Sequence, residues 1–159
     1  MRSVCVRIVI GVRIEGKTTK VKIICVCRPQ FKLRTRTTCP PTPQQFADDD
    51  FCYLTTIGRV TGQPHTIEIW FALDGDTLYM LSGSHTSDWV KNLLRAPDVA
   101  VRLGETTFAG RARVVAQADE DALARRLVLA KYQPRDSDDL SSWARTALPV
   151  AIDLAALDN

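Results

Sequence analysis

The sequence has few of the features that mark a membrane protein, a metalloprotein or a disulfide-stabilised domain. No apolar run approaches the roughly eighteen residues that a membrane-spanning helix needs. The apolar start, residues 1–11, is interrupted by Arg7 and precedes no small-residue cleavage site, so a signal peptide is not expected. Histidine occurs only twice, and the five cysteines include no C-x-x-C pair. We therefore expect reduced cytosolic thiols rather than a zinc site or a disulfide framework.

The chain as a whole also lacks a large net charge, because an excess of basic residues in one part nearly cancels an excess of acidic residues in the other. Residues 1–46 contain ten Lys/Arg and one acid, whereas the remainder contains eleven basic and seventeen acidic residues. This division predicts a basic N-terminal arm at 1–46 and a single folded domain at 47–159. The arm has no interleaved aromatic platform of the kind that single-strand binders use, so no nucleic-acid partner is expected. Contact of the arm with an anionic membrane surface stays open.

The hydrophobic pattern of the domain predicts mostly antiparallel strands and a few helices. Strands are expected at 51–57, 65–73, 77–81, 99–103, 106–116 and 148–154. Helices are expected between Ser87 and Pro97, at 119–132 and at 140–147. Asp74-Gly75 is the strongest hairpin signal in the chain. The fold class is therefore α+β, most simply a small barrel with two or three covering helices.

Two polar loops at strand ends carry the chemistry that the sequence offers. The first polar loop contains Arg59, Thr61, Gly62, Gln63, His65 and Thr66, and the second polar loop spans residues 82–87. Glycine amides, hydroxyl donors and one arginine are the groups that bind a phosphate. The second polar loop also leads into a helix N-terminus, which favours an anion. Polar loops at sheet ends are common, so this pattern alone is only suggestive.

An ordered series of motifs resembles a known family. The series is TTIGRVTGQP at 55–64, Trp70, Asp74-Gly75, Ser82-Gly83, WVKNL at 89–93 and Pro97-x-Val99. These residues resemble the deazaflavin-dependent nitroreductase family, which belongs to the FMN-binding split β-barrel group with the pyridoxamine phosphate oxidases. The resemblance covers roughly residues 52–155 and does not reach the basic arm.

The resemblance implies a split β-barrel, usually a homodimer, that binds coenzyme F-420, with FMN as the alternative cofactor. The cofactor-binding residues that we assign, from this resemblance and from the neighbouring strand, are Arg59, Thr61, Gly62, Gln63, Pro64, His65, Thr66, Glu68, Trp70, Ser82, Gly83, Ser84, Trp89 and Asn92. Two positions depart from the family pattern, because Val60 stands where many members have lysine and His65 where they have arginine. Fewer fixed positive charges would loosen the hold on an anionic tail, unless Lys91 compensates.

Several of these residues have an equally good structural interpretation. Trp70 could stack on the cofactor ring or simply pack in the core. Glu68 could orient the cofactor or pair with Arg59, or it could face solvent at a sheet edge. Trp89 is more readily explained as core than as a ligand contact. The H-x-E motif at 65, 66 and 68 lacks a following P-C-x-x-C, so a zinc deaminase is not expected.

The resulting functional expectation is an oxidoreductase that passes hydride from reduced coenzyme F-420 to a quinone, enone or nitro compound. No triad, carboxylate pair or metal cluster is needed, because the coenzyme carries the hydride. No catalytic side chain is assigned. The alternatives are a non-catalytic protein that binds a deazaflavin or FMN, and an FMN-dependent oxidoreductase. A cytoplasmic location is expected.

Overall fold

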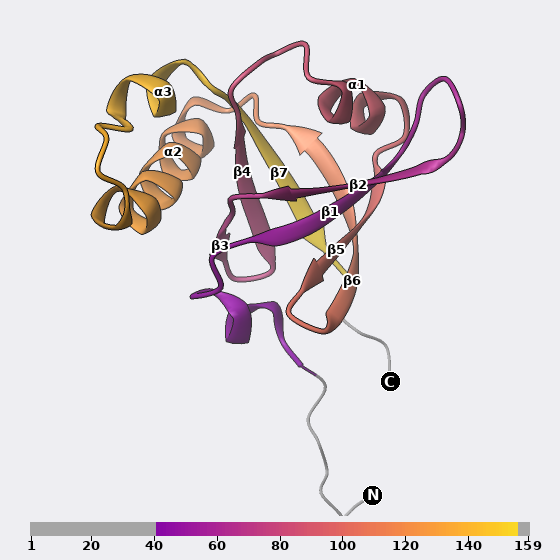
Figure 1. The fold of residues 1–159 in the computed structure, drawn as a ribbon, viewed down its shortest axis with the longest axis horizontal. Coiled ribbons are helices and arrows are strands. Elements are labelled where there is room, and N and C mark those ends of the chain that lie inside the picture. Colours follow the sequence, from indigo (N-terminus) through magenta and orange to yellow (C-terminus); the bar gives the residue numbers. More distant parts are fainter. Residues whose placement is uncertain (1–40, 156–159) are drawn as a thin grey trace, which may run out of the picture. The chain divides into compact units, whose positions relative to one another are not determined.

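The computed structural model describes residues 41–155, and residues 1–40 of the expected arm lie outside the described residues. Seven strands form one sheet in the order β2-β1-β5-β6-β7-β4-β3, with antiparallel pairing throughout. The strands are β1 (Cys52–Ile57), β2 (Pro64–Ile69), β3 (Ala72–Asp74), β4 (Thr77–Ser82), β5 (Asp98–Leu103), β6 (Thr106–Val114) and β7 (Leu148–Leu154). The sheet curls into a split barrel (Figure 1), so the α+β prediction is confirmed. No helix in the described part of the chain is long and apolar enough to cross a membrane.

The single strand predicted at 65–73 is wrong, because the chain forms two strands there. β2 ends at Ile69 and pairs with β1, while β3 starts at Ala72 and pairs with β4. These two strands occupy opposite edges of the sheet, yet only Trp70 and Phe71 separate them in sequence. This short corner holds the two edges close together and thereby closes the barrel.

The barrel interior is filled by the inward-facing side chains of five strands, β1, β4, β5, β6 and β7. The largest of these include Leu54, Met80, Val101, Phe108 and Ile152, all fully buried. Alternation along each strand places these residues on one face of the sheet, as the hydrophobic pattern predicts. Burial of such side chains stabilises the fold by about 1.5–3 kcal/mol each.

Two groups of helices cover different parts of the barrel. Helix α1 (Asp88–Arg95) lies over one end, and α2 (Ala118–Tyr132) and α3 (Ser141–Thr146) lie together on the flank beside β4 (Figure 1). A second apolar cluster packs beneath α2 and α3 on the outer face of the sheet. Arg113 on β6 bonds both Glu120 of α2 and Asp153 of β7, and so ties α2 to the sheet.

Two short 3-10 helices complete the described elements, η1 (Pro43–Phe46) and η2 (Gln133–Arg135). Pro43 is buried, and the ring of Phe46 meets Phe108 edge-on with centroids 6.1 Å apart. Residues 43–46, which the sequence analysis places at the end of the basic arm, therefore pack on the barrel in this structure.

Candidate functional site

The first polar loop connects β1 to β2 by a tight turn of residues 58–63. The Gly58 N–H donates to the Gln63 carbonyl and the Gly62 N–H donates to the Gly58 carbonyl, both at 2.8 Å. Gly62 has a φ of 67°, a left-handed conformation that glycine adopts without steric cost. This backbone geometry explains why glycine occupies this position of the predicted motif.

Gly58 provides the space in which His65 and Thr61 meet. A Cβ at Gly58 would lie 2.8 Å from the His65 ring and 2.8 Å from the Thr61 hydroxyl. The Thr61 Oγ1 and His65 Nε2 atoms are 3.4 Å apart, and Thr61 also accepts the Gln63 N–H. The glycine therefore fixes an imidazole and a hydroxyl side by side at the surface.

Arg59 is held in place by helix α1. The Asn92 Oδ1 atom accepts from the Arg59 backbone N–H at 3.1 Å and from its Nη1 at 3.2 Å. The Asn92 amide in turn donates to the buried Thr56 hydroxyl at 3.3 Å. On its other side, the Arg59 guanidinium donates from Nη2 to the Asp88 carboxylate at 2.9 Å. The arginine head is thus fixed at the start of α1.

These residues enclose a pocket of about 370 Å³ beside α1. Its lining includes five residues that the sequence analysis assigns to the cofactor site: Arg59, Thr61, His65, Trp89 and Asn92. It also includes Thr56, Gly58 and Asp88, which that assignment lacks. Thr56 and Gly58 lie within the 55–64 motif, which is the sequence signal that indicates them. Asp88 is expected first as a helix-start residue and only second as a cofactor contact.

The second polar loop is stabilised by its own hydroxyl groups. Ser82 is buried and donates to the Ser84 carbonyl at 2.7 Å, while Ser84 and Thr86 share a hydrogen bond of 2.9 Å. Ser87 also donates to the Ser84 carbonyl, at 2.9 Å. The loop leads directly into Asp88, so both polar loops meet at the first turn of α1. The first and second polar loops are therefore adjacent in space.

Thr66 and Glu68 lie on the opposite face of β2 from His65. Thr66 pairs with Thr55 of β1, with the two hydroxyls 2.8 Å apart. Glu68 lies opposite Tyr53 on β1, and its carboxylate raises the pKa of the Tyr53 hydroxyl. The suggested pairing of Glu68 with Arg59 is therefore wrong. Gln63 and Pro64 are exposed at the turn, outside the pocket lining.

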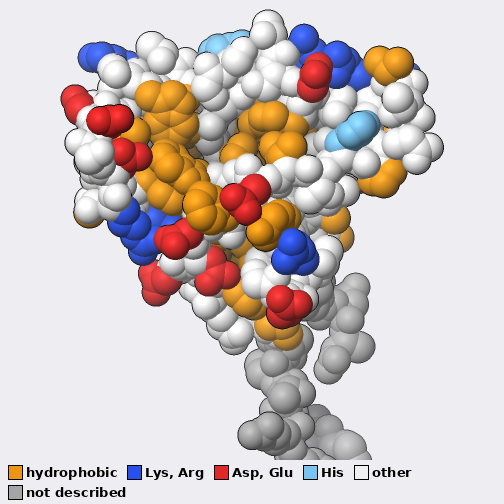
Figure 2. Space-filling model, in the orientation of Figure 1, with side chains coloured by type: hydrophobic (Ala, Val, Ile, Leu, Met, Phe, Trp, Pro, Cys, Tyr) orange, Lys and Arg blue, Asp and Glu red, His pale blue; other side chains and the backbone are white. Residues whose placement is uncertain are grey.

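Trp70 and Gly83 belong to the aromatic cluster beneath α2 and α3. Trp70 stacks on Tyr132 with centroids 4.5 Å apart and meets Trp143 edge-on at 5.9 Å. A Cβ at Gly83 would lie 3.3 Å from the Trp143 indole nitrogen. Hydrophobic side chains gather on this face of the molecule between α3 and β2 (Figure 2). For Trp70, packing is the role that the structure demonstrates.

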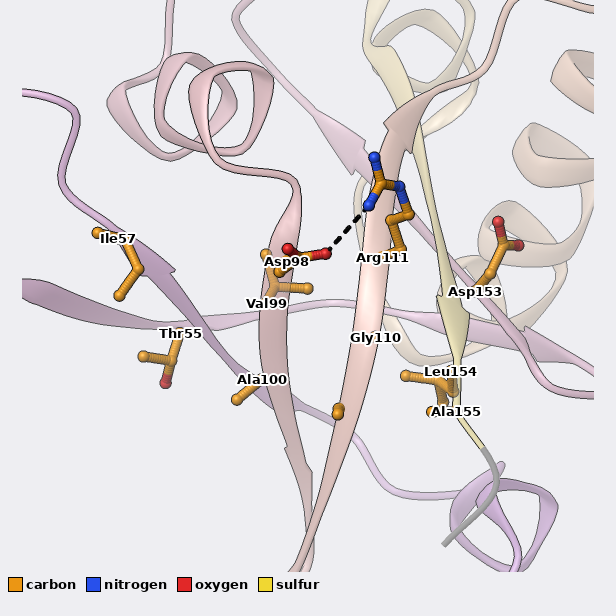
Figure 3. Close-up of a pocket in the computed structure, with 11 residues that line it drawn as sticks. Thr55, Ile57, Asp98, Val99, Ala100, Gly110, Arg111, Asp153, Leu154 and Ala155 are labelled. Atoms are coloured by element: carbon orange, nitrogen blue, oxygen red, sulfur yellow. Dashed lines mark hydrogen bonds and ion pairs between the residues drawn. The ribbon is translucent and has the colours of Figure 1, made fainter. Parts of the chain in front are cut away.

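A second pocket, of about 580 Å³, lies on the outer face of β1, β5, β6 and β7 (Figure 3). Small and apolar residues, among them Ala100, Ala109 and Gly110, form its floor, and an Asp98–Arg111 ion pair of 3.3 Å crosses one end. It contains none of the assigned cofactor residues. Within residues 41–155, no group of three or more His, Cys, Asp or Glu is arranged to hold a metal ion.

Comparison with known proteins gives a consistent result. The sequence model of the F420H(2)-dependent quinone reductase family matches residues 26–155. An F420H(2)-dependent quinone reductase of Mycobacterium tuberculosis is 36% identical over 73 residues, or 43% of this chain. That match spans 48% of the relative, so the similarity covers about half the length of the curated relatives.

Solved structures support the fold alone, because their sequence identities are low. A conserved hypothetical protein from Mycobacterium tuberculosis has a TM-score of 0.58 and 22% identity, and covers 77% of this chain and 85% of its own. The F420-H2 dependent reductase FDR-A has a TM-score of 0.54 and 17% identity, and covers 67% and 95%. The split-barrel prediction and the family resemblance are thus confirmed. The chain belongs to the F420H(2)-dependent quinone reductase family.

Proposed function

We propose that this protein is an oxidoreductase that uses reduced coenzyme F-420 to reduce a small electron-poor acceptor, with a quinone as the favoured class. The observation that carries the proposal is the pocket in which Arg59, Thr61 and His65 converge beside the start of α1. Membership of the family supports the choice of coenzyme.

The residues of this pocket fit the anionic tail of such a coenzyme. A guanidinium, an imidazole and a hydroxyl supply the hydrogen-bond donors that phosphate oxygens require. The Arg59 side chain is 34% exposed, so a ligand can reach it from solvent. The absence of a Cβ at Gly58 keeps His65 close to the loop backbone. The site therefore binds by a few fixed donors on a rigid scaffold.

The bound coenzyme supplies the hydride, and the side chains bind and orient it. Arg59 would hold the anionic tail, and Asn92, anchored on Thr56, keeps the arginine in position. Trp89 packs against the core and forms one wall of the pocket, which limits access of water.

Binding and turnover together test this function. We expect native mass measurement to show a complex with coenzyme F-420 and a weaker one, or none, with FMN. Reduced coenzyme F-420 mixed with a soluble naphthoquinone should then be reoxidised in proportion to the protein added. Absence of coenzyme binding with protein in excess contradicts the proposal. Tight binding without turnover over a panel of quinones, enones and nitro compounds favours the non-catalytic alternative instead.

We also propose that the protein acts as a homodimer. Among the described residues, no helix covers the outer-face pocket over β1, β5 and β6, and Ile57 at its edge is 41% exposed. A second copy would bury this surface. The cytoplasmic location stays a prediction from the sequence, and cell fractionation tests it.

A further inference from the structure

We propose that Asp88 is an affinity-determining residue of the Arg59 pocket: its carboxylate occupies the guanidinium until an anionic ligand displaces it. The inference rests on the proposed function, since it concerns the tail of the same coenzyme. Asp88 would oppose binding of the anionic tail, whereas the other polar residues of the pocket support it.

The two partners of Arg59 differ in how readily they can be displaced. Asn92 is 5% exposed, and its amide is already bonded to the buried Thr56 hydroxyl. Rotation of Asn92 would break that buried bond, so this partner is permanent. The Asp88 side chain is 80% exposed, and its one ion pair among the described residues is the contact with Arg59. An exposed ion pair of this kind contributes little and exchanges readily with another anion.

The position of Asp88 in the fold makes it a direct competitor. It is the first residue of α1, where the helix dipole and free N–H groups would otherwise favour an anion. Its carboxylate contacts Nη2 of Arg59 at 2.9 Å and lines the same pocket. A phosphate that takes this Nη2 hydrogen must therefore replace the carboxylate, and one that bonds any other guanidinium N–H remains near its negative charge.

Asp88→Asn tests the inference with little disturbance of the helix, because asparagine has nearly the same size and α1 loses only the modest interaction of one exposed charge with its dipole. We expect coenzyme F-420 to bind the variant about two- to fivefold more tightly at low salt, the range that an exposed ion pair represents. The gain should shrink as salt is added, because the repulsion is screened. Binding is measured by isothermal titration, with thermal melting as a check on folding.

Two further variants separate this effect from a general change of charge. Asp119→Asn is the matched control, since Asp119 is also an exposed acid in the first turn of a helix, α2, outside the pocket. It should leave affinity unchanged. Asp88→Asn in an Arg59→Ala background should give little gain, because the competition requires the guanidinium. Equal gains from Asp88→Asn and Asp119→Asn, or an undiminished gain without Arg59, would overturn the inference.

A second ligand keeps this test independent of the proposed function. Inorganic pyrophosphate, titrated in the same series, needs only the anion site. If the wild-type protein fails to bind coenzyme F-420, the proposed function is wrong, and the pyrophosphate series still decides on Asp88. Tighter pyrophosphate binding by Asp88→Asn supports the inference. Unchanged binding of both ligands contradicts it, whatever the activity of the enzyme.

Discussion

Arg59 depends for its position on Asn92, a residue 33 positions later in the chain. Both residues belong to motifs that predict a cofactor site, but the two motifs are separate in the sequence. Their contact could not be predicted, because it is produced by the packing of α1 against the end of the barrel. The same limit applies to Asp88, whose sequence context indicates only the start of a helix.

Replacement of Arg59 by alanine should weaken coenzyme binding more than any other single change in the pocket. A charge-assisted hydrogen bond contributes about 1.5–3 kcal/mol, so we expect about a tenfold to hundredfold loss of affinity. Isothermal titration measures it. Arg126→Ala, at an exposed position of α2, is the control and should bind normally. An affinity within twofold or so of wild type for Arg59→Ala would remove this arginine from the site.

Two glycines of the same loop should respond differently to alanine. Gly58→Ala forces His65 and Thr61 apart, since the new Cβ would lie 2.8 Å from both side chains. We expect lower coenzyme affinity with a small change in stability, because those side chains can move. Gly62→Ala meets no atom within 4 Å but has a φ of 67°, so it should lose about 1–2 kcal/mol of stability. Gly62→Ala should bind the coenzyme with nearly wild-type affinity. Urea unfolding and titration compare the two variants, and identical behaviour would contradict this assignment of roles.

At the scale of the element, the corner between β2 and β3 is held by the hydroxyl of Tyr132. This hydroxyl accepts the Phe71 N–H at 2.9 Å. Its own proton can be donated to the Asp50 carbonyl at 2.9 Å or to the Phe71 carbonyl at 3.0 Å. Alternation of polar and apolar residues ends at Ile69, where an apolar run to Leu73 begins. Such a run is also typical of a buried strand, so it does not locate the break. The corner exists because β2 and β3 must pair with different strands.

Tyr132→Phe should therefore destabilise the barrel. It leaves the buried Phe71 N–H without its partner while retaining the ring that stacks on Trp70. We expect the free energy of unfolding to fall by about 1–3 kcal/mol in urea titrations. Tyr79→Phe is the matched control, because the Glu120 carboxylate that it bonds also accepts two bonds from Arg113. If Tyr79→Phe lowers the free energy of unfolding as much as Tyr132→Phe does, the Tyr132 hydroxyl has no special role at the corner.

Lys131, adjacent on α2, should give the stability of the protein a distinctive pH dependence. Its ammonium donates to the Asp49 carbonyl at 2.6 Å and lies 3.7 Å from the centre of the Phe71 ring. Burial, followed by the charge of Arg135, lowers the pKa of Lys131 from 10.5 to about 8. Above about pH 8 the unfolded chain binds more protons at this lysine than the folded protein does. Protonation of this lysine therefore lowers the stability of the fold below about pH 8, and this penalty is relieved as the pH rises toward 10.5.

The change of unfolding free energy with pH is best measured between pH 8 and 9, in the wild type and in Lys131→Met. Above pH 9 an opposite contribution begins, because burial raises the pKa of the Cys52 thiol from 9.0 to about 12 and the unfolded chain loses that proton first. The wild-type minus variant difference in unfolding free energy should rise with pH in this window. A flat difference would show that the lysine titrates normally in the folded state.

At the scale of the whole molecule, the α+β class, the three helices and most strand positions follow from hydrophobic periodicity and turn residues. The last strand, 148–154, has the predicted bounds. The order of the strands in the sheet cannot be predicted from hydrophobic periodicity or turn residues. β7 lies between β6 and β4, an arrangement that depends on long-range pairing rather than on any local pattern. Which face of β2 meets the pocket also depends on register, and this separates Thr66 and Glu68 from His65.

The proposed dimer can be tested on the outer face. Ala109→Arg places a long charged side chain in the floor of the pocket shown in Figure 3, so we expect a monomer in sedimentation velocity. Leu94→Arg, at a 64% exposed position on α1, should leave the assembly unchanged. A monomeric wild-type protein would contradict the proposal directly.

The place of β7 between β6 and β4 also has a consequence for biosynthesis. Until residues 148–154 leave the ribosome, β4 and β6 each lack a neighbour on one side, and the chain has two incomplete sheets joined at the β2–β3 corner. The sheet can therefore be completed only after this strand has emerged. A chain truncated before residue 148 would expose the unpaired edges of β4 and β6, which favours aggregation and proteolysis.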